Sequence, residues 1–281
     1  MMNFLKVCIM KNPIMKQLFF STLCLAVIFF LTAAQTGATV IHGGIDTSEH
    51  AQNLCKVTDK NNGAPVPYAR ITVPAKNFTT YSDSKGQFAL PNNITNAAIL
   101  SATKENYKPF SITINKNTGI LSIQLEKSKP FDIKLESDLC HLGDNNFSGM
   151  SANACQFKGR AIGPVYNKTF VISQCQQNQQ PYLVIGSIIG IDTALARGIG
   201  QNSITTSYAS PPCVYLNGQK ICEIQINGDN QRIYLPKGLI KFNQKNTITI
   251  KAGRNLMQKA YVDYDDIEFI NLSIENFNIK S

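Results

Sequence analysis

The residues that could do chemistry gather near the C-terminus. Asp263, Asp265, Asp266 and Glu268 fall within six positions, in a chain whose formal net charge is +9. The segment 270–274 that follows alternates apolar and polar residues, as a strand with two different faces does. Carboxylates this close repel one another, so they need hydrogen-bond donors, water or a cation to sit together. An acidic cluster at the start of a closing strand is therefore the first candidate site.

A second polar loop, after residue 142, carries Asp144 and Asn145. If the C-terminal half folds so that its first and last strands are neighbours, this loop meets Asp265 and Asp266. Calcium takes six to eight oxygen ligands at about 2.3–2.6 Å, so we predict a structural Ca²⁺ held by these four residues. The alternative is that the Asp and Asn side chains cap turns by accepting hydrogen bonds from nearby backbone N–H groups.

The longest polar connection, residues 192–212, is the candidate ligand loop. A guanidinium, two amides and a phenol are suited to sugar hydroxyls, with the ring available for stacking, and they come from Arg197, Gln201, Asn202 and Tyr208. An ordinary solvated loop is the alternative. Its glycines do not open a helix after a strand, which excludes a dinucleotide site.

The residues for catalysis are few. Of three histidines, two precede residue 52, so a nucleophile–histidine arrangement would depend on His141. No Gly-x-Ser-x-Gly or His-Glu-x-x-His motif occurs. Neighbouring carboxylates on one strand end cannot flank a glycosidic bond from opposite sides. We therefore predict a protein that is not an enzyme.

The N-terminal segment predicts export. Three lysines precede an apolar run over 18–31, and small residues follow around Ala34 and Ala38, as in a signal peptide. We assign residues 1–38 to that signal and 39–51 to a polar leader, and expect a secreted, periplasmic or cell-surface protein. The alternative is an uncleaved membrane anchor, because the apolar and small-residue span of 17 residues is at the lower limit for crossing a bilayer.

The positive charge is spread along the chain. Removing the three lysines of the signal from the total of +9 leaves +6. No dense run of Lys and Arg appears, so we exclude nucleic acid as a partner and expect at most nonspecific attraction to acidic surfaces.

Six cysteines remain beyond the signal, an even set that suits an exported protein. Asn217 and Gly218 form a two-residue turn signal. Counting outward from that turn places Cys213 opposite Cys222 in a non-hydrogen-bonded pair, where Cα atoms approach to about 4.5 Å. We predict a disulfide between these two.

The other four cysteines admit three pairings. We favour Cys140 with Cys155 because they are close in sequence, and the alternative for Cys55 is a buried free thiol.

Short alternating runs between turn residues recur along both halves of the chain, at 52–127 and again at 131–278. Phe110 to Ile114 and Leu121 to Leu125 alternate, and residues 182–191 are almost continuously apolar, which suits a strand covered on both faces. No helix-length apolar period appears. The pattern predicts an all-β fold with two sandwich domains.

Four segments of the first half carry recognisable motifs: Val57–Asp59, Gly63–Val73, Ser82–Leu90 and Asn106–Pro109. The most specific motif is the Asp-x-x-Gly-x-Phe hairpin. In this order the segments resemble the carboxypeptidase regulatory-like domain, although Cys55 and Asn106 stand where the family often has Gly. The resemblance implies a transthyretin-like sandwich of seven strands that is a non-catalytic appendage.

Four segments recur in order along the second half: Leu142–Gly149, Pro236–Lys241, Asn246–Ile250 and Asp265–Phe269. In this order they resemble galactose-binding-domain-like modules. The resemblance implies a jelly roll that often carries structural calcium near its two ends.

The sequence thus indicates an exported, non-catalytic binding protein. We expect its jelly roll to bind carbohydrate. The alternative is a structural or adhesive protein that docks onto another surface protein and has no sugar site.

Overall fold

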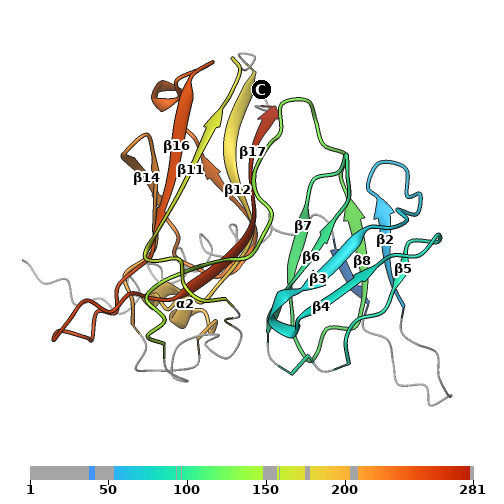
Figure 1. Ribbon diagram of the computed structural model, residues 1–281, viewed down its shortest axis with the longest axis horizontal. Helices are drawn as coiled ribbons and strands as arrows, with labels where there is room; N and C mark the ends of the chain where they lie inside the picture. Colours follow the sequence, from blue (N-terminus) through green and yellow to red (C-terminus); the bar gives the residue numbers. More distant parts are fainter. Residues whose placement is uncertain are drawn as a thin grey trace, which may run out of the picture. The chain divides into compact units, whose positions relative to one another are not determined.

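A computed structural model describes residues 38–41, 54–92, 94–95, 97–147, 157, 159–174, 178–202 and 208–278. Residues 37–281 form one compact unit. The described part of this unit is built almost entirely of strands, in four main sheets (Figure 1), as the alternating sequence pattern predicts. All of the predicted signal peptide except Ala38 lies outside the described residues. Across the described ranges no helix is long and apolar enough to span a bilayer.

Residues 55–125 form the N-terminal sandwich, whose seven strands β2–β8 are joined by β1. One sheet has the order β1 (Ala38–Ile41), β8 (Ile120–Leu125), β2 (Cys55–Asp59) and β5 (Gln87–Phe88). The other has the order β4 (Phe78–Tyr81), β3 (Arg70–Val73), β6 (Ala98–Thr103) and β7 (Phe110–Ile114). A 3₁₀ turn, η2 (Pro74–Lys76), joins β3 to β4.

Alternation along β8 fixes which side chains enter the core of this sandwich. Leu121, Ile123 and Leu125 are fully buried, while the residues between them face outward. Two of the segments that match the family are joined by a hydrogen bond, because the Tyr107 hydroxyl donates to the carboxylate of Asp59. These two residues therefore stabilise the sandwich.

The Asp83 turn is confirmed, but the hairpin expected around it is wrong. Asp83 Oδ1 accepts hydrogen bonds from the backbone N–H groups of Lys85 and Gln87. Gly86 adopts φ = +73°, a conformation that glycine takes without steric cost. The strands on either side, β4 and β5, belong to different sheets. The turn therefore carries the chain from one layer of the sandwich to the other.

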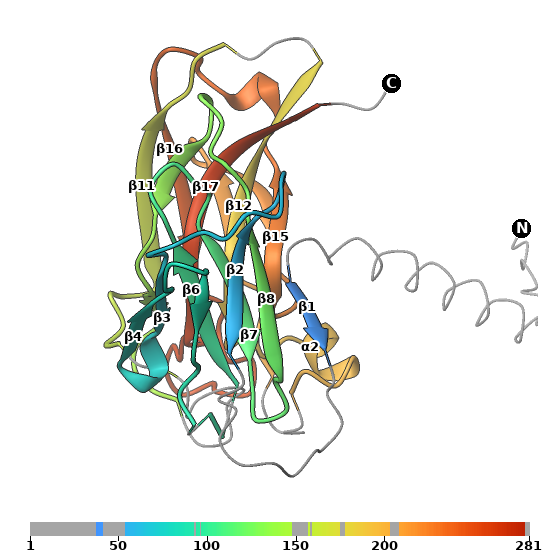
Figure 2. The same cartoon turned by 90° about the vertical axis from the view of Figure 1, so that its right-hand side faces the viewer.

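Residues 133–278 form the C-terminal sandwich (Figure 2). Its first sheet has the order β10 (Cys140–Leu142), β17 (Ile267–Asn278), β12 (Gln179–Ile189) and β15 (Gly228–Tyr234), and β9 (Ile133–Glu136) also pairs with β17. Its second sheet has the order β11 (Val165–Val171), β16 (Lys245–Lys251), β13 (Cys213–Leu216) and β14 (Gln219–Glu223).

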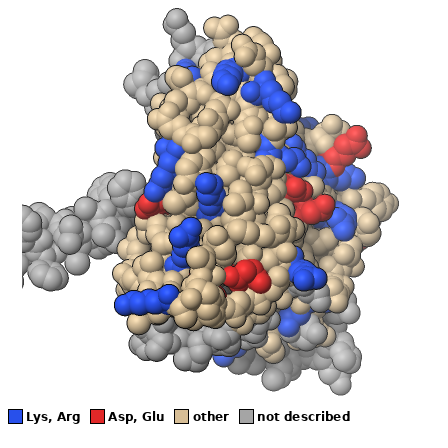
Figure 3. Space-filling model, turned by 60° about the vertical axis from the view of Figure 1, so that its left-hand side comes forward, with Lys and Arg blue, Asp and Glu red and all other residues tan. Residues whose placement is uncertain are grey.

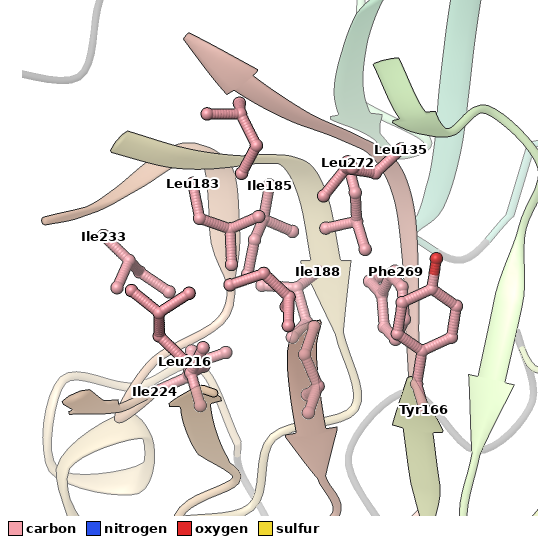
Figure 4. Packing of buried hydrophobic residues seen from close by; sticks show 14 of the residues in the cluster. Leu135, Tyr166, Leu183, Ile185, Ile188, Leu216, Ile224, Ile233, Phe269 and Leu272 are labelled. Carbon is pink, nitrogen blue, oxygen red and sulfur yellow. The ribbon is translucent and has the colours of Figure 1, made fainter. Parts of the chain in front are cut away.

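The core of the C-terminal sandwich lies between these two sheets. Leu183 and Ile185 from β12 meet Leu216 from β13, and Tyr166 from β11 packs edge-on against Phe269 from β17 (Figure 4). β12 is buried along nearly its whole length, as its apolar run predicts. A 3₁₀ turn, η4 (Lys237–Leu239), lies between β15 and β16.

The first two strands of the C-terminal sandwich, β9 and β10, both lie beside its last strand. β9 and β10 each pair antiparallel with β17, and His141 of β10 lies opposite Glu268. This confirms the prediction that the two ends of this half come together.

The expectation of no helix in this half is corrected by α2 (Ala194–Gly198). The helix has only five residues, too few to show an apolar period, and Thr193 caps its N-terminus by accepting a hydrogen bond from Ala196 N–H.

The predicted register of the 213–222 hairpin is wrong. The Asn217–Gly218 turn is present, with φ = 52° and 87°. A bulge next to Val214 shifts the pairing, so that Val214 lies opposite Cys222 and Cys213 lies opposite Glu223. Both cysteines carry free thiols.

The other cysteine predictions concern Cys140, Cys155 and Cys55. Cys140 is a free thiol whose pKa burial raises to about 11, and Cys155 lies outside the described residues. Cys55 is a buried free thiol whose sulfur accepts a hydrogen bond from Leu121 N–H.

The N-terminal sandwich packs against the first sheet of the C-terminal sandwich, and we call this contact the junction. The Lys108 ammonium pairs with Glu275 on β17, and lies 3.2 Å from Glu126 and 3.5 Å from Asp132. Ile99 packs against Ile189 and Ile270.

Asp229 on β15 adds hydrogen bonds to the junction. Its carboxylate accepts from the backbone N–H and hydroxyl of Thr113 and from the hydroxyl of Ser187. Ion pairs, hydrogen bonds and apolar contacts together thus hold the N-terminal sandwich against the first sheet of the C-terminal sandwich.

Candidate functional site

A cavity of about 180 Å³ lies at one end of the C-terminal sandwich, and we call it the acidic cavity. Three chain segments that are not strands build its wall. Backbone bridges join Thr193 to Ala209, Ala209 to Asn255 and Arg254 to Tyr264. These bridges hold the loop after α2 against the segment that leads into β17.

The lining combines acids, amides and rings. The amides are Asn146 and Asn255, the rings are Phe147, Tyr208, Tyr261 and Tyr264, and the carboxylates are Asp192, Asp263, Asp265 and Asp266. All four carboxylates belong to residues that are at most 8% exposed. The cavity therefore brings together buried negative groups and aromatic surfaces.

Asp263 is held by two amides. Its Oδ1 accepts from Asn146 Nδ2 at 2.8 Å and its Oδ2 from Asn255 Nδ2 at 2.8 Å. The same Asn146 amide donates to the Tyr261 hydroxyl at 3.2 Å. Neutral donors thus orient this carboxylate at the wall.

The pKa of Asp265 is strongly perturbed. Its Oδ2 accepts from the backbone N–H of Asp192 at 3.3 Å. Burial raises the pKa of Asp265 well above its ordinary value, and the nearby negative charges of Asp192, Asp266 and Asp263 raise it further. A displaced pKa in a concave site is typical of functional residues.

Asp266 is bound on one side to the loop after β10. Its Oδ1 accepts from Asn145 N–H at 3.1 Å and lies 2.7 Å from His141 Nε2. A Cβ at Gly143, which has φ = +147°, would lie 2.3 Å from the Asp266 carboxyl carbon. Glycine at position 143 is therefore required for this close approach.

His141 is a buried structural residue and lies outside the cavity lining. It is 2% exposed, and Nδ1 lies 2.6 Å from the Gly159 carbonyl oxygen. Burial by itself would lower the His141 pKa, but its hydrogen bonds to Asp266 and Gly159 outweigh burial and raise it. Phe157 packs on its ring.

The predicted calcium ligands come together only in part. Asp144 accepts with Oδ1 from Asn146 N–H and with Oδ2 from Tyr264 N–H, and Asn145 Oδ1 accepts from Ala161 N–H. Only the first of these is a local turn-capping bond, and the other two join segments that are farther apart in the chain. Within the described ranges no group of three or more His, Cys, Asp or Glu is arranged to hold a metal ion. Calcium bound by this quartet stays a prediction.

Of the predicted ligand residues, only Tyr208 lines the cavity. The Arg197 guanidinium stacks 4.9 Å from the centroid of the Tyr208 ring. Asn202 donates to Asp192, and Gln201 exchanges hydrogen bonds with the backbone of Asn227. These three residues support the loop that carries Tyr208.

Sequence reasoning did not single out Asp192, Asn255 and Tyr261 as site residues. Asn255 and Tyr261 precede the acidic cluster by only a few positions, so proximity to that cluster was the available signal. Asp192 gave no local signal, because it reaches the cavity through pairing between distant loops.

Apolar side chains crowd the rim. Leu256, Met257 and Val262 are 47%, 67% and 52% exposed, beside Tyr261 at 56%. We call residues 256–262 the rim loop. Exposed apolar side chains gathered in one short loop make that loop a candidate for contact with a ligand or a partner.

Comparison with known protein families gives one match. Residues 55–135 match the CarboxypepD_reg-like domain family, which confirms the first of the two resemblances over the N-terminal sandwich and extends into β9. No curated protein matches the chain. The galactose-binding-like resemblance of the second half stays a prediction.

Proposed function

We propose that this chain is an exported, non-catalytic binding protein whose C-terminal sandwich, a galactose-binding-like jelly roll, binds carbohydrate in the acidic cavity. The observation that carries the proposal is the lining, in which buried carboxylates and amides stand beside four aromatic rings. A CarboxypepD_reg-like domain is compatible with binding. Export by the predicted signal would bring the protein to the outside of the cell, where glycans are abundant.

The groups at the cavity have the chemistry that sugars need. Asp263 and Asn255 offer acceptors and donors at fixed positions, as the hydroxyls of one sugar ring require. Tyr261 and Tyr208 offer ring faces for the C–H side of the sugar. A volume of about 180 Å³ is below the roughly 300–1,000 Å³ of sites for drug-sized ligands, so the cavity suits a single sugar unit.

A glycan array probed with the full protein, followed by calorimetric titration, tests the proposal. Tyr261→Ala removes a half-exposed ring from the cavity rim, and we expect about a tenfold loss of affinity. Tyr234→Ala is the matched control, since Tyr234 is 52% exposed and lies on β15 away from the lining. Absence of glycan binding, or equal losses in both variants, would contradict the proposal.

The rim loop favours a second candidate function, docking onto another surface protein without a sugar site. Met257 is the most exposed of its apolar side chains. In that case no glycan binds, and a protein partner captured by the unaltered chain is lost with Met257→Ser. Retention of the partner by Met257→Ser would rule out docking through this loop.

A further inference from the structure

The acidic cavity has a charge opposite to that of the chain. Four of its lining residues are aspartates, and no Lys, Arg or His is among the described residues that line it. The chain as a whole has a net charge of +9. On the face shown in Figure 3, lysines and arginines outnumber the acids and are scattered. The cavity is thus a local negative site on a basic protein.

Two of the acids have only neutral partners. Asp263 is held by the amides of Asn146 and Asn255, and Asp265 by a backbone N–H. Neither forms a salt bridge within the described part of the chain, where the carboxylates that do include Glu126, Asp132 and Glu275. The neutral donors orient the Asp263 carboxylate but leave its charge in place, and a buried uncompensated charge is costly.

A second, independent observation comes from Asp266. This residue is 1% exposed and lines the cavity. Its Oδ1 is engaged by His141 and Asn145, but its buried Oδ2 has no hydrogen-bond partner among the described residues. A buried acceptor without a donor is rare in folded proteins. A ligand donor would satisfy this oxygen, which is buried and so becomes reachable only when the cavity lining shifts.

The rings add to the attraction for a cation. An ammonium or guanidinium group is attracted to the face of an aromatic ring within about 6 Å of its centroid. Two of the cavity tyrosines already have such contacts, with Arg197 4.9 Å from Tyr208 and Arg254 5.9 Å from Tyr264. The carboxylates and the aromatic rings of the cavity therefore both favour a positively charged ligand.

We propose that the sugar bound in the acidic cavity is an amino sugar with a free, protonated amine, which approaches Asp263, Asp265 and Asp266. This inference rests on the proposed carbohydrate function and names the class of sugar. The amides of Asn146 and Asn255 hydrogen-bond the sugar hydroxyls. Uronic acids are rejected, because their carboxylate would face buried like charges.

The test compares matched oligosaccharides. The full protein is titrated calorimetrically, with chelator present, with a tetramer of glucosamine, the N-acetylated tetramer of the same linkage and a tetramer of galacturonic acid. A charged hydrogen-bond donor stabilises a complex more than a neutral one, so we expect the free amine to bind at least about tenfold more tightly than the N-acetyl form. The galacturonic acid tetramer should not bind.

Variants assign the preference to the cavity. Asp263→Asn keeps the shape of the side chain and removes its charge, so it should lose most of the preference for the free amine and leave affinity for the N-acetylated tetramer within about twofold. Glu105→Gln is the matched control, because it removes one charge from an exposed residue outside the lining. This control should leave the preference for the free amine unchanged.

Each contrary outcome is informative. Equal or tighter binding of the N-acetylated tetramer, or binding of the galacturonic acid tetramer, overturns the amino-sugar assignment and leaves carbohydrate binding standing. Binding of a lysine tetrapeptide as tightly as the glucosamine tetramer overturns the sugar and points to a protein ligand. No binding of any of the sugars overturns this inference and the proposed function together.

Discussion

The junction and the acidic cavity both bury carboxylates, but Asp263 and Asp265 of the cavity, unlike the acids of the junction, form no salt bridge with the described residues. At the junction, Lys108 lies among Glu126, Asp132 and Glu275. At the cavity, Asp263 and Asp265 have only amide and backbone donors. The comparison teaches that the same residue type serves two purposes. Acids compensated within the chain hold the two sandwiches together, and acids left uncompensated are available to a ligand.

Glu126 at the junction and Asp265 at the cavity titrate in opposite directions, although burial also raises the pKa of Asp132 at the junction. At the junction, burial would raise the pKa of Glu126, but the charges and hydrogen bonds of Lys108 and Lys60 together outweigh burial and lower it. At the cavity, burial raises the pKa of Asp265 and the neighbouring acids raise it further. Ionisation of Glu126 therefore stabilises the fold, and ionisation of Asp265 destabilises it.

The largest expected effect is at Lys108. Lys108→Met removes the ammonium while three carboxylates stay at the junction, and removing one partner of a buried ion pair costs about 3–5 kcal/mol. We expect a loss of this size in the free energy of unfolding, measured by urea denaturation. Lys129→Met is the control, because Lys129 also approaches Glu126 but its side chain is 55% exposed. It should change stability by less than about 1 kcal/mol. Similar losses in both variants would show that Lys108 is not the central cation.

The next effect is at Asp229, which joins the junction by hydrogen bonds. Asp229→Ala leaves the Thr113 N–H and the Ser187 hydroxyl without their acceptor, and an unsatisfied partly buried donor costs about 1–3 kcal/mol. Asp229→Asn keeps one acceptor oxygen and should lose less. Equal losses from both, measured by thermal denaturation, would argue against these hydrogen bonds.

A smaller effect, of opposite sign, is expected at Asp265. The pKa of Asp265 is raised in the folded state, so between the ordinary Asp pKa and the raised one the folded state holds a proton that the unfolded state has released. Stability therefore falls as pH rises through this range. Asp265→Asn keeps the acceptor for Asp192 N–H and removes this loss of stability. We expect its melting temperature to exceed the parent value at pH 7 by about 2–4 °C, the equivalent of 1 kcal/mol. The two proteins should melt alike near pH 4, and a variant less stable at pH 7 would contradict the raised pKa.

Calcium gives the smallest expected change. Extracellular modules bind calcium with dissociation constants of about 10⁻⁴–10⁻³ M, so 1 mM Ca²⁺ would stabilise the fold by about 0.4–1.4 kcal/mol. If the predicted quartet of Asp144, Asn145, Asp265 and Asp266 binds the ion, the melting temperature rises in Ca²⁺ relative to chelator and Asp265→Ala abolishes the rise. An unchanged melting temperature, with Asp265→Ala also neutral, would exclude structural calcium there.

The sequence predicted the strands better than the way they are combined. Alternation with period two is a local property, so the buried face of β8 could be identified from Leu121, Ile123 and Leu125 alone. The Asp83 turn was also local, but the same turn chemistry serves a hairpin or a crossing between sheets. The bulge next to Val214 inserts one residue without a sequence signal, and this moved Cys213 away from Cys222.

The candidate site was predicted in part. Its acids were visible because Asp263, Asp265 and Asp266 are close in sequence. The rest of the lining was not visible, because Tyr208 and Asp192 join Asn255 through pairing between loops far apart in the chain. Predicting a cavity of this kind requires the register of irregular segments, which no periodic pattern specifies.

The most direct test of the central claim is the calorimetric titration of the unaltered protein and Asp263→Asn with the glucosamine tetramer. The account predicts saturable binding by the unaltered protein and a loss of at least about tenfold in the variant, since the carboxylate contributes a charge-assisted hydrogen bond. Equal affinity in the two proteins would contradict the claim that uncompensated carboxylates of the acidic cavity recognise the ligand.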